Sequence, residues 1–93
     1  MKPVKEFQDL EVGKLYVLQV PVIRGITRIG PGPAHEFIPC FENLGALKFD
    51  EYVVLLEIGS VNDLGCYRAK ILTKDGIVGW INFWCDEWAK AGL

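Results

Sequence analysis

The sequence has few of the features that assign a function at once. No apolar run approaches the length of about 20 residues that a membrane-spanning helix needs. Ten Lys and Arg residues stand against twelve Asp and Glu residues, so there is no basic excess to neutralise the phosphates of duplex DNA. The opening segment, MKPVKEFQDLEVGK, contains no hydrophobic signal core. We therefore expect a soluble, cytoplasmic protein without membrane contact, for which nucleic acid is a less favoured partner.

Cysteine and histidine are also scarce. The three cysteines, Cys40, Cys66 and Cys85, are far apart and form no Cys-x-x-Cys pair. This argues against a disulfide framework and against a zinc site. The single imidazole, His35, stands in a segment rich in Gly and Pro, so nothing indicates a Cys–His nucleophile pair. We interpret the three thiols as small apolar side chains.

Catalytic motifs are missing as well. The adjacent carboxylates Asp50-Glu51 and Asp86-Glu87 point in different directions on a strand or a helix, so neither pair converges on one substrate. Gly25, Gly30 and Gly32 lack the Lys-Ser/Thr that completes a phosphate-binding loop. We predict that the protein is not an enzyme and binds neither a cofactor nor a metal ion.

What the sequence does contain is typical of a small β-protein. With 93 residues, 51% of them hydrophobic and 24% charged, it is expected to form one globular domain over residues 1–93. Runs rich in β-branched and aromatic residues predict the strands, and Asp75-Gly76 predicts a tight hairpin turn. The predicted strands are 15–23, 37–41, 47–49, 52–58, 66–72 and 77–81, after a loose lead-in over 1–9. Residues 24–36 are expected to form the longest loop.

The C-terminal segment has a different pattern. Asn82 can cap a helix, and Trp84, Trp88 and Ala91 follow one another at helical spacing before Gly92. This pattern predicts a short helix over 82–91 that follows a β-barrel of about five or six strands over 10–81. The predicted fold class is therefore all-β, a small barrel or sandwich.

From Ile38 to Trp84 the order of these signals resembles a Src-homology-3-like (SH3-like) barrel. The matching segments are Ile38–Phe41, Leu47-Lys48-Phe49, Val53–Ile58, Cys66–Ile71, Asp75-Gly76 and Gly79-Trp80-Ile81. The Gly-Trp-Ile form is more similar to the bacterial branch of these domains, which suggests an accessory protein of a bacterium or a mobile element. The strand at 15–23 is either an extra N-terminal strand or the true first strand of the barrel.

The resemblance does not extend to polyproline binding. The signalling members use a Trp at the start of the fourth strand and a Pro and a Tyr after the closing strand. This chain has Cys66, Asn82 and Cys85 at the matching places. The resemblance therefore implies a fold and leaves the ligand open.

Aromatic and cationic residues suggest a contact surface. We predict a non-enzymatic protein-interaction module that docks a protein partner or a second copy, forming a homodimer. The predicted surface contains Trp84, Trp88, Tyr67, Trp80, Arg24, Arg28 and His35. One alternative is single-stranded nucleic-acid binding through Arg24, Arg28, Arg68 and Lys70 with an aromatic platform. Another is a small-molecule pocket lined by Trp80, Tyr67 and Trp84.

Overall fold

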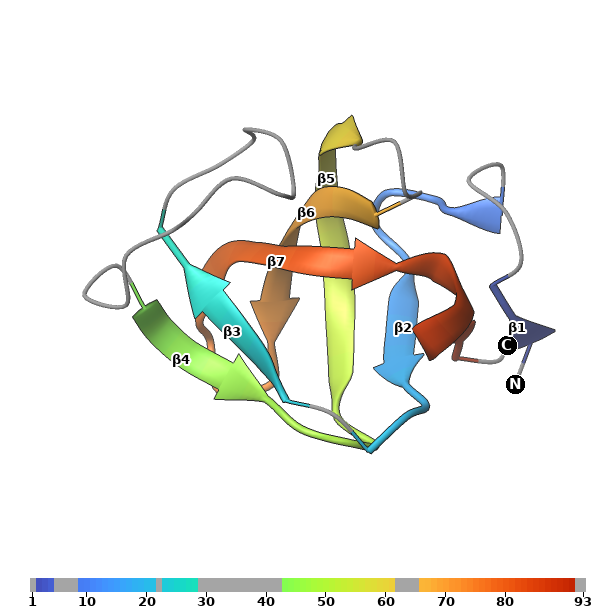
Figure 1. The fold of residues 1–93 in the computed structure, drawn as a ribbon, viewed down its shortest axis with the longest axis horizontal. Helices are drawn as coiled ribbons and strands as arrows, with labels where there is room; N and C mark the ends of the chain where they lie inside the picture. Colours follow the sequence, from blue (N-terminus) through green and yellow to red (C-terminus); the bar gives the residue numbers. More distant parts are fainter. Residues whose placement is uncertain (1, 5–8, 22, 29–42, 62–65, 92–93) are drawn as a thin grey trace.

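The computed structural model describes residues 2–4, 9–21, 23–28, 43–61 and 66–91, and it is all-β in these ranges apart from short turns. Eight strands form one curled sheet in the order β1-β8-β2-β5-β6-β7-β3-β4. Every pair of neighbouring strands is antiparallel. The strands are β1 (Lys2–Pro3), β2 (Leu15–Leu18), β3 (Arg24–Thr27), β4 (Asn43–Leu47), β5 (Tyr52–Val61), β6 (Cys66–Thr73), β7 (Val78–Trp84) and β8 (Trp88–Lys90). Figure 1 shows the curl, with β3 and β4 at one side and β1 and β2 at the other.

The centre of the sheet is the meander β5–β6–β7, which confirms the three strongest strand predictions. β5 is rich in Val, Leu and Ile, the residue types that favour a strand, and β6 alternates buried and half-buried positions along most of its length. The turn between β6 and β7 contains the predicted Asp75-Gly76, and Gly76 has a φ of 86°, a left-handed value that glycine adopts without strain. The Thr73 hydroxyl accepts a hydrogen bond from the Ile77 amide at 3.1 Å, which fastens this turn.

The strand predicted over 15–23 ends at Leu18 and lies inside the sheet. β2 pairs with β5 on one side and with β8 on the other. It is therefore not an added edge strand but the first long strand of the sheet. The lead-in prediction was wrong for residues 2–4: β1 pairs with β8, and Val4 is buried.

The predicted helix over 82–91 is wrong. Residues 82–84 complete β7, Cys85–Glu87 form a single 3-10 turn, and Trp88–Lys90 form β8. β8 returns to β2 and also receives β1, so strand pairing satisfies the backbone groups that a helix would have satisfied internally. Trp84 and Trp88 are four residues apart because Trp84 ends β7, Trp88 begins β8 and the three-residue 3-10 turn lies between them.

The hairpin β3–β4 differs from the prediction: β3 lies within the expected loop over 24–36, and the expected strand at 47–49 shares only Leu47 with β4, because a turn follows at 49–50. The predicted strand at 37–41 lies outside the described residues. β3 pairs with β7 through Thr27 and Trp80. A Cβ at Gly79 would stand 2.5 Å from Ile26 Cγ2 and 2.8 Å from the Thr27 carbonyl oxygen. Glycine at this position therefore allows β3 to approach β7.

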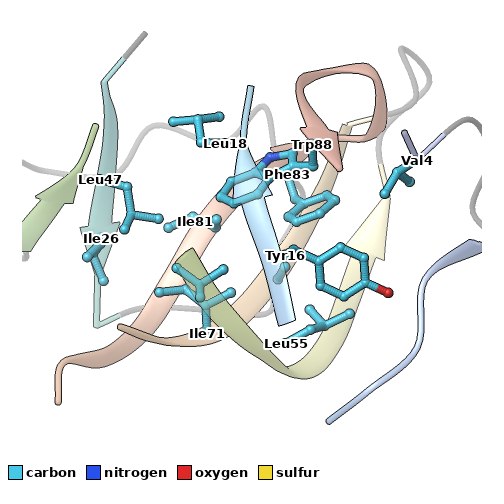
Figure 2. Packing of buried hydrophobic residues seen from close by; sticks show 12 residues of the cluster. Val4, Tyr16, Leu18, Ile26, Leu47, Leu55, Ile71, Ile81, Phe83 and Trp88 are labelled. Atoms are coloured by element: carbon cyan, nitrogen blue, oxygen red, sulfur yellow. The ribbon is translucent and has the colours of Figure 1, made fainter. Parts of the chain in front are cut away.

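The inner face of the curled sheet holds the hydrophobic core. Figure 2 shows its aromatic part, where Tyr16, Phe83 and Trp88 come together from β2, β7 and β8. The rings of Phe83 and Trp88 stack with centroids 4.7 Å apart, and Tyr16 meets Phe83 edge-on at 6.1 Å. The aliphatic part contains Val4, Leu18, Ile26, Leu47, Val53, Leu55, Ala69, Ile71 and Ile81.

Candidate functional site

The aromatic surface expected at the C-terminus does not form. Trp88 is 1% exposed and packs on Phe83 within the core. Trp84 is half-buried on β7. Because Trp88 faces the core, the two indoles do not share an exposed stripe, and Trp88 cannot contribute to a docking surface in the folded protein.

Trp80 and Tyr67 face opposite sides of the sheet. Tyr67 packs against the core from β6. Trp80 pairs with Lys70 and alternates along β7 with the core residues Ile81 and Phe83, so it lies on the outer face and is 8% exposed. Trp84, two residues beyond Asn82, shares that outer face. The aromatics proposed to line one pocket are thus divided between the two faces.

Two of the predicted cationic residues bind other groups of the chain. Arg24 forms a two-point ion pair with Glu87, in which Nε lies 3.0 Å from Oε1 and Nη2 contacts Oε2. Arg68 is 2% exposed. Its guanidinium donates to Asn82 Oδ1 at 3.0 Å and to Thr27 Oγ1 at 2.9 Å. Arg28 is exposed and Lys70 half-buried, whereas His35 lies outside the described residues.

The two described thiols are poorly suited to nucleophilic chemistry. Burial raises the pKa of the Cys66 thiol, and the guanidinium of Arg24 offsets part of that rise. Burial also raises the pKa of the Cys85 thiol, and the charge of Asp86 raises it further. A raised pKa lowers the fraction of thiolate at neutral pH, and the thiolate is the reactive form. Within the described ranges, no three His, Cys, Asp or Glu side chains gather to hold a metal ion.

A row of apolar side chains crosses the outer face of the sheet. Leu15 on β2 pairs with Val54 on β5, Val54 pairs with Leu72 on β6, and Leu72 pairs with Val78 on β7. Paired residues of antiparallel strands share a face. Since Leu55 and Ile71 lie in the core, their neighbours Val54 and Leu72 face outward. We call Leu15, Val54, Leu72 and Val78 the outer row.

The outer row is open to solvent, most of all at its two ends. Leu15 is 41% exposed and Val78 is 44% exposed, while Val54 and Leu72 between them are half-buried. Tyr52, two residues before Val54 on β5, is 40% exposed and extends the apolar surface along that strand. The row thus joins apolar side chains from β2, β5, β6 and β7, which are neighbours in the sheet.

The next outward-facing positions carry opposite charges. Glu57 on β5 pairs with Lys70 on β6, and a register shift between Leu55 and Glu57 brings Glu57 to the outer face. Glu57 is exposed and Lys70 half-buried. Neither forms an ion pair with another residue in the described part of the chain. An acid and a base therefore stand side by side next to the apolar row.

The sequence contains only an indirect signal for the outer row. Residues 52–56 are almost continuously apolar, a pattern that predicts a strand covered on both faces. In the structure the inner face of this strand packs into the core, whereas on its outer face Tyr52 is exposed and Val54 is half-buried. The alternation of residues 66–72 indicated which side of β6 faces the core, but the pairing that aligns Leu72 with Val54 and Val78 is a property of the fold.

Comparison with known proteins gives no relative. No family model, no curated protein and no solved structure matches the chain. Among the residues described here, none belongs to a helix that is long and apolar enough to cross a membrane.

Proposed function

We propose that this protein is a non-enzymatic protein-interaction module and that it docks its partner through the outer row together with Tyr52. The observation that carries the proposal is a single register of apolar side chains from four adjacent strands, exposed at Leu15 and Val78 and half-buried at the two residues between them. Soluble monomers rarely expose a contiguous apolar patch of large area, and such patches commonly mark protein contacts.

We further propose that the curled sheet is a Src-homology-3-like barrel of the bacterial type. The order of its parts supports this: the meander β5–β6–β7, the tight turn at 74–77, and a closing strand β8 that returns to β2. In this assignment β2 is the first strand, and the hairpin β3–β4 is inserted between the first strand and β5.

The outer row replaces the surface proposed from the sequence. Trp88 lies in the core and Arg24 is paired with Glu87, so neither is free to meet a partner. Positions where a polyproline groove would need aromatic residues or proline are used internally: Cys66 is buried, and Asn82 accepts a hydrogen bond from Arg68. The partner is therefore expected to present a complementary apolar face rather than a proline helix.

Site-specific photocrosslinking in cells tests the proposal. A benzophenone amino acid replaces Val78, in the outer row, or Ile23, which is 67% exposed and lies outside the row. We expect a discrete protein adduct from position 78 and none from position 23. The adduct should disappear when Leu72→Lys places a charge in the row and persist with Arg28→Glu, at an exposed position elsewhere.

The same adducts from both positions, or no adduct from position 78, would contradict the proposed function. The mass of the adduct adds a second reading, because it distinguishes a second copy of this chain from a different protein.

A further inference from the structure

We infer that the outer row binds a second copy of this chain, and that the two copies are related by a two-fold axis that runs between β5 and β6, parallel to them. This inference rests on the proposed function, because it identifies the occupant of the same surface. Its basis is the pattern of side chains on the outer face, which is complementary to itself about that line.

The apolar residues match one another under this symmetry. A two-fold axis between β5 and β6 places each copy's β5 against the other's β6, and each copy's β2 against the other's β7. Val54 then meets Leu72 of the second copy at the centre of the contact, and Leu15 of one copy lies over Val78 of the other at its rim, because the four residues lie in one register. An isologous contact requires a patch that matches itself in this way.

The charges match under the same rotation. Glu57 and Lys70 are paired across β5 and β6, so the axis lies between them. Glu57 of each copy therefore faces Lys70 of the other, and the interface contains two equivalent ion pairs. With the axis along the row instead, Glu57 would face the end of the patch that holds Tyr52. Charge complementarity thus selects both the occupant and the direction of the axis.

The contact is expected to be weak. A stable interface buries about 800 Å² on each partner. The outer row is one residue deep on each of four strands, and it lies on the convex side of a curled sheet. We expect dissociation in the range of roughly 10–100 µM, as for small transient contacts.

Charge reversal and mixing test the inference. In the Glu57→Lys variant each copy carries lysine at both positions, so the two lysines of one copy face those of the other. In Lys70→Glu each copy carries glutamate at both positions, and the same repulsion arises between glutamates. Sedimentation velocity should therefore show each variant alone as a monomer under conditions in which the wild type dimerises. An equal mixture of the two variants should associate at least about tenfold more tightly than either alone, because each copy now meets its opposite. The double variant Glu57→Lys/Lys70→Glu should dimerise like the wild type.

The mixture also serves as the control for folding, because misfolded variants would not recover association when combined. The inference is overturned if the wild type stays a monomer up to near-millimolar concentration, if either single variant dimerises like the wild type, or if the mixture does not associate. A wild-type monomer that still gives a crosslink from position 78 to a different protein would overturn this inference alone and leave the proposed function standing.

Discussion

At the scale of single residues, the buried Arg68 is the feature that the sequence interpretation missed most clearly. The alternation of β6 placed it opposite the core, and such a position predicts a solvated cation. It is instead 2% exposed and hydrogen-bonded to Asn82 on β7 and Thr27 on β3. A guanidinium has five N–H donors, so one side chain can bind several strands at once. Arg68 links the meander to the β3–β4 hairpin.

Replacing Arg68 should therefore destabilise the fold. Arg68→Met retains apolar bulk but removes the donors to Asn82 and Thr27, and we expect the free energy of unfolding in urea to fall by about 2–4 kcal/mol. Arg28→Met is the matched control, because Arg28 is exposed. Its effect should stay within about 0.5 kcal/mol. Equal losses in the two variants would show that the buried hydrogen bonds add nothing to stability.

The buried Cys66 thiol should make the free energy of unfolding depend on pH in the alkaline range. Burial raises its pKa above the ordinary value of 9.0. The unfolded chain then releases this proton at a lower pH than the folded protein does. The contribution to stability is complete below the unfolded-state pKa and is lost as the pH rises through the folded-state pKa.

Urea unfolding at several pH values from neutral to above the ordinary thiol pKa measures this effect. The wild type should lose stability over that range, and Cys66→Ala should lose less, although the variant starts from a lower stability because of the cavity. Parallel pH profiles for the two proteins would contradict a raised pKa at Cys66.

At the scale of strands, the close approach of β3 to β7 depends on Gly79. An added Cβ would meet Ile26 Cγ2 at 2.5 Å and the Thr27 carbonyl oxygen at 2.8 Å. We expect Gly79→Ala to lower the free energy of unfolding by about 2–3 kcal/mol, since one of the two obstacles is backbone. Gly76→Ala is the comparison: no atom lies within 4 Å of its Cβ, and its φ of 86° alone should cost about 1 kcal/mol.

Chemical denaturation of the two variants separates these causes. A Gly79→Ala variant no less stable than Gly76→Ala would indicate that β3 can move away from β7 without loss. Hydrogen exchange should then show whether the hairpin β3–β4 opens on its own.

The strand scale also shows how far the sequence could predict the fold. β5, β6 and β7 followed from β-branched runs and the Asp75-Gly76 turn, which are local signals. β3 did not, because Arg24–Thr27 is four residues long and contains a glycine, so its pairing with β4 and β7 decides its conformation. The C-terminal helix was wrong for a similar reason: burial of Trp88 on Phe83 and pairing of β8 with β2 outweigh a local helical spacing.

At the scale of the whole molecule, the candidate site can be recognised only when the register of the sheet is known. The sequence identified aromatic and cationic residues as a surface, but the fold buries Trp88 and Arg68 and pairs Arg24 with Glu87. The outer row consists of common aliphatic residues, and none of them is unusual in its local sequence. They form one surface because the pairing of four strands aligns them, and no single segment of the chain shows that alignment.

The central prediction, that the outer row binds a second copy of this chain, is tested most directly by the mass of the protein in solution. Light scattering at micromolar and near-millimolar concentration is applied to the wild type, to Val78→Lys in the row and to Ile23→Lys outside it. The wild type and Ile23→Lys should rise from the mass of one chain toward that of two, while Val78→Lys stays at one. A wild type that remains at the mass of one chain throughout, or a Val78→Lys variant that dimerises equally well, would contradict the account.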